Sequence, residues 1–233
     1  MSILSKAFLR GVVMVIGFGV AGAAGAQSWD QPVNWSGPYV GVEGGYGWGS
    51  SHHSDDGFES GGFQNKGGLV GGEAGFNWQL SNIVVGIEGD MSWADIGGRT
   101  AGTADGLCGG DANPNCRTRL DDLGTVRGRV GLALGPLLPY ATGGLAFGGV
   151  HAAEGHNGDD DAFGSGSSYR AGWTVGAGLE AMVMPQVTAK LEYLHVDLGN
   201  GPVFTDTFGD GSSGAQNVDF RTDIVRAGIA FKF

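Results

Sequence analysis

The feature that most constrains this chain is a pattern of alternating polarity that recurs eight times along it. In the last of these segments, Val225, Ile229 and Phe231 fall on one side of an extended chain, and Arg226 and Lys232 fall on the other. A period of two residues indicates a β-strand with one apolar and one polar face. The segments cover residues 38–49, 66–80, 83–96, 121–134, 140–153, 171–183, 187–198 and 221–233. The pattern predicts an all-β fold.

The connections between these segments are alternately short and long. The short ones carry residues typical of tight turns and lie at 81–82, 135–139 and 184–186. The long ones are polar and rich in Gly, Asp and Ser, and lie at 50–65, 97–120, 154–170 and 199–220. Membrane β-barrels have this arrangement, with turns in the periplasm and loops outside the cell. We therefore predict an eight-stranded antiparallel up-and-down transmembrane β-barrel.

The first 26 residues have the character of an export signal. Lys6 and Arg10 precede an apolar stretch over 11–21, and the Ala-Gly-Ala at 24–26 is a small-x-small site of the kind that signal peptidase cuts. A retained membrane helix needs about 20 apolar residues, and this run is shorter. The predicted organisation is a signal peptide over 1–26, a periplasmic N-terminal segment over 27–37 and an outer-membrane β-barrel over 38–233.

Glycine content favours strands over helices. The chain has 48 glycines in 233 residues, about three times the average usage of roughly 7%, and glycine disfavours helix formation. These glycines follow no collagen period and lie among aromatic and β-branched residues, which argues against a disordered linker. After residue 26, no segment is apolar for long enough to span a membrane as a helix.

The charge and the cysteines limit the possible partners. Removal of the signal with Lys6 and Arg10 leaves 11 basic residues against 24 acidic ones, a net charge of −13, which disfavours binding to nucleic acid. Cys108 and Cys116 are the only cysteines. Because the periplasm is oxidising, we predict a disulfide between them.

Aromatic residues fall at both ends of the expected strands. Those at the loop ends are Trp48, Trp93 and Trp173. Those at the turn ends are Phe76, Trp78, Phe231 and Phe233. Aromatic rings prefer the two membrane interfaces, so this distribution predicts two girdles around a barrel. A soluble β-sandwich also alternates in polarity, but it has no reason to place Trp in two separate belts.

The alternation also places many charged side chains inside the barrel. The inward set is Glu43, Glu73, Glu88, Asp90, Arg127, Arg129, Glu180, Lys190, Glu192, Arg226 and Lys232. An eight-stranded barrel is only wide enough to be filled by its own side chains, and charges confined there are costly unless they are paired. We therefore predict a cross-strand charge network that plugs the lumen. In this network, Arg127 and Arg129 are expected to pair with Glu88, Glu180 or Glu192, and Arg226 is expected close to these pairs.

Several motifs resemble the strands of small outer-membrane β-barrel, or "porin family", surface proteins. The opening strand resembles that family in Trp35-Ser36-Gly37-Pro38-Tyr39-Val40-Gly41, followed by Gly45-Tyr46-Gly47-Trp48. Later strands agree in Gly75-Phe76-Asn77-Trp78-Gln79, Thr125-Val126-Arg127-Gly128-Arg129-Val130-Gly131, Gly143-Gly144-Leu145-Ala146-Phe147-Gly148, Gly172-Trp173-Thr174-Val175-Gly176-Ala177-Gly178-Leu179-Glu180 and Lys190-Leu191-Glu192-Tyr193-Leu194.

The resemblance implies an OmpA-type barrel that the barrel-assembly machinery inserts into the outer membrane. That machinery recognises a final strand with an aromatic end, which is Phe233 in this sequence. The peptidoglycan-binding domain that follows the barrel in large proteins of this type is not expected here.

Two acidic stretches are possible sources of metal ligands. They contain His52, His53, Asp55, Asp56 and Glu59, and Glu154, His156, Asp159, Asp160 and Asp161. Both stretches lack the fixed spacing of a calcium loop and lie among glycines that cost entropy to order, so we interpret them as solvated acidic loops. We predict no specific metal site and no cofactor.

An enzyme of the outer membrane needs a catalytic pair near the outer rim, where His151 and His195 are expected. However, His195 is expected on the lipid side with Tyr193, whereas Ser92 is expected to point inward. No pair of nucleophile and base is evident, and we predict no enzymatic activity.

Three functions remain open: a structural surface barrel, a diffusion channel for small solutes, and an adhesin or ligand-binding protein that acts through its loops. The first is favoured, because the charged side chains are expected to fill the lumen. The expected partners are the outer-membrane bilayer with its lipopolysaccharide, and the barrel-assembly machinery during insertion. The partner of the loops is left open.

Overall fold

The computed structural model describes residues 33–55, 58–59, 63–101, 114–156, 159–202, 206–207, 213–214 and 217–233. Side chains are described over 33–50, 64–98, 118–151, 167–199 and 220–233. All of these residues belong to one compact unit, Pro32–Phe233. Within them, no helix is long and apolar enough to cross a membrane.

Eight long strands form the wall of the fold. They are β1 (Gly37–Asp55), β3 (Phe63–Leu80), β4 (Ile83–Ala101), β5 (Pro114–Leu132), β6 (Leu137–His156), β7 (Asp159–Met184), β8 (Val187–Pro202) and β11 (Asn217–Lys232). Within the residues that the structure describes, three strands of two residues accompany them: β2 (Phe58–Glu59), β9 (Asp206–Thr207) and β10 (Ser213–Gly214). The short β2 pairs with β1, and β9 pairs with β10.

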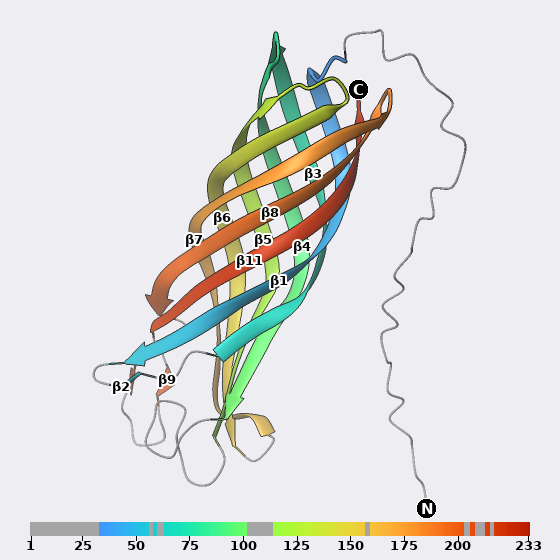
Figure 1. Cartoon of the computed structure of the whole chain (residues 1–233). Helices are drawn as coiled ribbons and strands as arrows, with labels where there is room; N and C mark the ends of the chain where they lie inside the picture. The colour runs from blue at the N-terminus through green and yellow to red at the C-terminus, as the bar shows by residue number, and fades with distance from the viewer. Residues whose placement is uncertain are drawn as a thin grey trace, which may run out of the picture. The chain divides into compact units, whose positions relative to one another are not determined.

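The long strands close into a barrel. Each pairs antiparallel with its neighbours in the order β1, β3, β4, β5, β6, β7, β8 and β11, and β11 returns to pair with β1 from Tyr39↔Lys232 to Ser54↔Asn217. Figure 1 shows the strands tilted around this closed wall, with the C-terminus at the end that carries the tight turns. The predicted eight-stranded antiparallel barrel is confirmed.

The strands are longer than the alternation predicts. β7 begins at Asp159 rather than near residue 171, and β1 continues to Asp55 rather than ending near residue 49. The prediction of long loops over 50–65, 97–120, 154–170 and 199–220 is therefore wrong for the parts of these ranges that lie in strands. Backbone pairing continues beyond the region where one face must be apolar, so the strands extend past the point where the alternation stops.

The turn between β5 and β6 is also tighter than predicted. β6 begins at Leu137, so the turn centres on Gly135 and Pro136 instead of covering 135–139. Gly135 has a φ of 63°, a left-handed conformation that glycine adopts at little cost. A backbone bridge between Leu134 and Leu137 closes the turn.

The two faces of the wall differ as the alternation requires. On β11, Val225, Ile229 and Phe231 are exposed on the outer face, whereas Ile224 and Arg226 are buried in the lumen. Both buried apolar clusters of the described residues consist largely of lumen-facing side chains, so the core of the fold lies inside the barrel.

Candidate functional site

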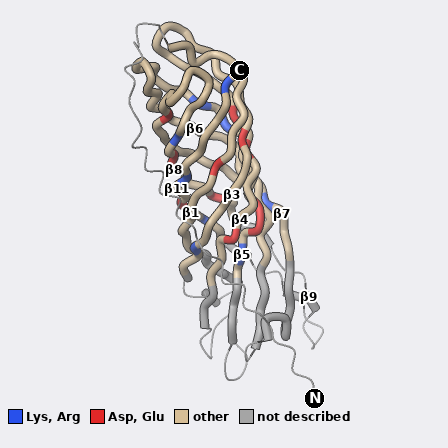
Figure 2. Tube along the Cα trace, turned by 90° about the vertical axis from the view of Figure 1, so that its right-hand side faces the viewer, with Lys and Arg blue, Asp and Glu red and all other residues tan. Residues whose placement is uncertain are grey.

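The lumen is filled by three layers of side chains. The order is readable along β8, where Thr188, Lys190 and Glu192 are followed by Leu194 and Val196 on the same inward face. A small apolar cluster lies at the turn end, an ionic layer lies in the middle, and an aliphatic layer lies towards the loop end. Figure 2 marks the acidic and basic positions along the strands of the wall.

Arg127 on β5 lies in the ionic layer and is 2% exposed. Its Nη1 donates to Glu192 Oε1 at 3.0 Å, and its Nη2 pairs with Glu88 and with Asp90 Oδ2, the latter at 3.1 Å. Its Nε donates to Thr125 Oγ1 at 2.9 Å. One guanidinium group therefore joins carboxylates from β4 and β8, as its planar set of donors allows.

Arg226 on β11 has a similar role across the closing seam of the barrel. Its Nε and Nη2 lie 2.7 and 2.6 Å from Glu192 Oε2. Its Nη1 pairs with Glu43 on β1 and lies 3.2 Å from Asp90 Oδ1. The strands β1, β4, β8 and β11 are thus connected through one side chain.

Arg129 on β5 lies between two tyrosine rings nearer the turn end. Its Nη1 donates to Tyr39 Oη at 3.1 Å and lies 3.4 Å from Glu88 Oε2, and its Nη2 pairs with Glu180. Its guanidinium carbon lies 4.2 Å from the centre of the Tyr140 ring. This stacking adds a cation–π contact to the ion pairs.

Lys190 on β8 is surrounded by carboxylates. Its Nζ pairs with Glu73 and lies 3.4 Å from Glu43 Oε2 and 3.3 Å from Glu88 Oε1. Glu88 also accepts a hydrogen bond from Tyr39 Oη at 2.6 Å. Each basic group of the layer is thus shared by at least two carboxylates.

Glycines on the inner face make room for the tyrosines of this layer. A Cβ atom on Gly75 would lie 2.4 Å from the ring of Tyr39, and one on Gly178 would lie 2.6 Å from the ring of Tyr140. The Tyr140 hydroxyl donates to Glu192 Oε1 at 3.0 Å. Glycine at these positions therefore allows the large rings to reach the ionic layer.

Most of the predicted inward residues meet in this layer. Ten of them are buried and paired: Glu43, Glu73, Glu88, Asp90, Arg127, Arg129, Glu180, Lys190, Glu192 and Arg226. Lys232 is the exception, because its Nζ donates to Asn34 O at 2.7 Å at the turn end of β11. The ionic layer therefore holds six acidic and four basic side chains.

The sequence analysis names Trp35 only as part of a family motif and does not predict its place in the lumen, where it is fully buried beside Val84, Leu138 and Met182 at the turn end. Its backbone N–H donates to Gln79 Oε1 at 2.7 Å, and its indole N–H donates to Gly135 O at 3.2 Å. Trp35 precedes β1 and lies outside every alternating segment, so the alternation gave no signal for it.

The aliphatic layer was also missed. Its largest buried side chains include Ile96, Leu120, Leu194, Leu198 and Phe220. A signal for this layer does exist on β8, where the alternation inverts. At Glu192 and Tyr193 the inner face is polar and the outer face carries an aromatic ring. Two residues later the order is reversed, because Leu194 on the inner face is apolar and His195 on the outer face is polar.

The aromatic residues lie on the outer face near the strand ends. Trp48, Trp93 and Trp173 are exposed at the loop ends, with 43%, 76% and 49% of their surface accessible. At the turn ends, the Phe76 and Trp78 rings lie 4.6 Å apart, and the Phe231 and Phe233 rings meet edge to face at 5.1 Å.

The histidines at the loop end lie on the outer face. His195 Nδ1 is 2.8 Å from Asp223 Oδ1, and His151 Nε2 is 3.2 Å from Asp121 Oδ2. Ser92 is buried in the lumen, where it donates to Glu43 Oε1 at 3.4 Å. The barrel wall therefore separates Ser92 from His195.

Some predicted features lie outside the described residues. They include the side chains of Cys108 and Cys116, and those of both acidic stretches, 52–59 and 154–161. Among the residues that the structure does describe, no group of three His, Cys, Asp or Glu side chains is arranged to hold a metal ion.

A closed antiparallel barrel with an apolar outer face and a charged interior defines a membrane-embedded β-barrel protein. The family model "Outer membrane protein beta-barrel domain" matches residues 15–233. This chain belongs to that family and is an outer-membrane protein.

Several curated relatives are similar over most of the chain. The 31 kDa outer-membrane immunogenic protein of Brucella melitensis is 38% identical over 212 residues, which cover 86% of this chain and 84% of the relative. The 25 kDa outer-membrane immunogenic protein of Brucella abortus is 33% identical, with coverages of 86% and 80%. The 22 kDa outer membrane protein of Rhizobium leguminosarum bv. viciae is 32% identical, with coverages of 86% and 79%.

Solved structures share the fold at low sequence identity. The outer membrane protein OprG of Pseudomonas aeruginosa is 14% identical with a TM-score of 0.54, and the match covers 85% of this chain and 96% of OprG. The outer membrane protease OmpT of Escherichia coli is 9% identical with a TM-score of 0.52, with coverages of 84% and 97%. These two likenesses concern the fold alone.

Proposed function

We propose that the protein is a structural surface barrel of the outer membrane whose lumen is closed by its own side chains. The observation that carries this proposal is the succession of three packed layers along the lumen: the Trp35 cluster, the ionic layer and the aliphatic layer. A barrel of eight strands has an interior that side chains can fill completely. An open diffusion channel needs a continuous polar path, and the buried apolar layers at both ends oppose one.

Conductance tests this proposal. The purified barrel, inserted into a planar bilayer, is expected to give no steady current under conditions in which an open porin does. The presence of inserted protein is checked by the heat-dependent gel mobility of the recovered sample. Reproducible large open channels would contradict the closed lumen and favour the alternative of a diffusion channel for small solutes.

A second candidate is an adhesin or ligand-binding role of the loops. The Brucella relatives are named outer-membrane immunogenic proteins, which supports loops that reach the cell surface in this chain too. A pull-down that compares the intact barrel with a barrel whose loops are trimmed tests this role. Capture of the same partner by both forms would contradict it.

The proposed role includes no catalysis. The separation of His195 from Ser92 supports this reading, because a base must lie within hydrogen-bond reach of its nucleophile.

We further propose the barrel-assembly machinery as the partner during insertion, and the lipopolysaccharide of the outer leaflet as the partner after it.

A further inference from the structure

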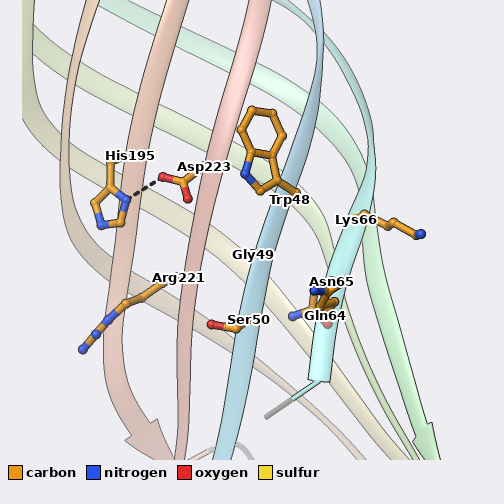
Figure 3. Close-up of a pocket in the computed structure, with 9 residues that line it drawn as sticks. All are labelled: Trp48, Gly49, Ser50, Gln64, Asn65, Lys66, His195, Arg221 and Asp223. Carbon is orange, nitrogen blue, oxygen red and sulfur yellow. Dashed lines mark hydrogen bonds and ion pairs between the residues drawn. The ribbon is translucent and has the colours of Figure 1, made fainter.

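A groove of about 390 Å³ lies at the loop end of β3, β1, β11 and β8. We call it the rim groove, and its side chains come from two rows across these strands. The row nearer the membrane centre pairs Lys66, Trp48, Asp223 and His195 in that order. The row nearer the loops includes Gln64, Ser50 and Arg221. Figure 3 shows Trp48 and Ser50 between Arg221 on one side and Lys66 on the other.

Asp223 in the rim groove and Asp197 beside it both contact neighbouring side chains. Asp223 Oδ1 accepts a hydrogen bond from Tyr193 Oη at 2.7 Å and lies 2.8 Å from His195 Nδ1. Asp197 Oδ2 lies 3.2 Å from Arg221 Nε, and the Arg221 side chain is still 57% exposed. These contacts occupy oxygens of both carboxylates and leave more than half of the arginine side chain exposed.

Lys66 provides the second positive charge. It lies on the outer face, is exposed, and has no ion-pair partner within the described part of the chain. Together, Lys66 and Arg221 give the rim groove two basic side chains that are exposed on the outer face. Such a site attracts an anion that approaches from the outer face.

The surface below the rim groove is apolar. Two residues further along each strand towards the membrane centre, Gly68, Tyr46, Val225 and Tyr193 pair across the same four strands and also face outward. Gly68 has no side chain, and a Cβ atom there would meet no atom closer than 3.8 Å, so the wall is indented beside Tyr46. The rim groove therefore lies at the boundary between a polar and an apolar surface, the depth at which lipid head groups lie.

We propose that the rim groove binds the phosphate-bearing head group of a lipopolysaccharide molecule of the outer leaflet. Lys66 and Arg221 donate to the phosphate oxygens, and an acyl chain lies against Tyr46, Gly68 and Val225. Arginine and lysine are the usual partners of phosphate in proteins, and Trp48 supplies an amphipathic ring at the interface. The inference rests on the lipopolysaccharide partner proposed above and is independent of whether the lumen is closed.

Lipid A carrying two phosphates is the probe, and binding to the purified barrel in detergent is measured by native mass spectrometry. The double variant Lys66→Ala with Arg221→Gln is expected to bind it at least about tenfold more weakly, since each charged hydrogen bond contributes roughly that factor. The matched control is Arg119→Gln, which removes a rim arginine of β5 outside the groove. This control is expected to bind lipid A like the unchanged protein.

The remaining arms decide what the groove recognises. Lipid A without phosphates, phosphatidylglycerol and inorganic phosphate are each expected to bind more weakly than lipid A. Equal binding of any of these three would overturn the assignment to a phosphorylated outer-leaflet glycolipid, as would unchanged lipid A affinity in a double variant that keeps its heat-dependent gel mobility. The planar-bilayer result is a separate measurement, so either proposal can fail without the other.

Discussion

Arg127 shows why the ionic layer depends on arginine. Three of its nitrogens contact oxygens of Glu88, Asp90, Glu192 and Thr125, which come from three strands. A lysine ammonium at this position has no planar fork with which to meet separated carboxylates in fixed directions. The residue therefore positions the strands and also compensates their charge.

The first prediction is that Arg127→Leu destabilises the barrel by about 3–5 kcal/mol, because it leaves buried carboxylates without a partner. The midpoint of urea unfolding, followed by gel mobility, measures this. Adding Glu192→Gln to Arg127→Leu is expected to recover part of the loss, since the two residues are coupled. Arg119→Leu, at an exposed ion pair, is the control and is expected to cost less than about 1 kcal/mol. Equal losses for Arg127→Leu and Arg119→Leu would contradict the role of the network.

The second prediction concerns Trp35. Trp35→Ala is expected to destabilise the barrel by about 3–5 kcal/mol, as removal of a fully buried large side chain does. The same variant is expected to remain non-conducting, because the ionic and aliphatic layers still fill the lumen. Trp93→Ala, at the most exposed of the described tryptophans on the outer face, is the control for the stability measurement. A steady current through Trp35→Ala would mean that this cluster alone closes the lumen.

Among the elements, β8 shows what the sequence can and cannot predict. Its inward Lys190 and Glu192 and its outward Leu191 are readable from the alternation, and so is the strand itself. The continuation of β8 to Pro202 is not predictable from the sequence, because the alternation inverts at Leu194 and does not continue to the end of the strand. Beyond the bilayer the outer face becomes polar, and the inner face is free to become apolar. Alternation therefore predicts the membrane part of each strand and gives little information on the extension above it.

Bulges add to this loss of signal. The register shifts between Trp93 and Ile96 on β4 and between Leu120 and Asp122 on β5, both towards the loop end. On β5 the extra residue exchanges the two faces of the strand, so a strict period of two fails across it. Leu120 and Leu123 are both buried for this reason. On β4 the alternation continues, with Ser92, Ala94 and Ile96 all buried. The ionic layer lies below these bulges, which is why its members were predictable by parity.

At the end of β11, we predict that Phe233 acts mainly in assembly. Its ring is 66% exposed and contacts Phe231, and its backbone N–H donates to Pro38 O at 3.0 Å. Removal of Phe233 therefore removes few side-chain contacts from the folded barrel. Deletion is expected to lower the amount of assembled barrel in cells while leaving refolding of the purified chain into detergent nearly normal. Unchanged membrane levels in cells would contradict a role in recognition by the assembly machinery.

In the connection between β4 and β5, we predict a disulfide between Cys108 and Cys116. The backbone of Cys116 pairs with Thr100 near the start of β5, so the bond would join the connection to the wall. The chain-entropy estimate gives a stabilisation of roughly 2–3 kcal/mol for so small a loop. Thiol labelling of the unreduced, denatured protein is expected to modify neither cysteine. Labelling of both would refute the bond, and labelling after reduction is the positive control.

At the scale of the whole molecule, the layers inside the barrel and the tryptophan rings outside it indicate the same level for the outer boundary of the membrane. The inversion of β8 between Tyr193 and His195 lies at the level of Trp173, whose ring centre is 5.5 Å from that of His195. On the neighbouring strand, the outward positions change from Val225 to Asp223 at the same level. The outer boundary of the apolar surface therefore runs through the loop-end tryptophans.

The last prediction tests this placement with tryptophan fluorescence in lipid bilayers. Variants that keep a single tryptophan at position 35, 78, 93 or 173 are reconstituted with lipids that carry a quencher either near the head group or at the centre of the acyl chains. Trp78, Trp93 and Trp173 are expected to be quenched best by the head-group label, because all three lie on the outer face near a strand end. Trp35 is expected to be quenched by neither label, because it is buried inside the barrel. Quenching of Trp35 to the same extent as Trp78 would place it on the lipid side and contradict both the closed turn end and the second prediction.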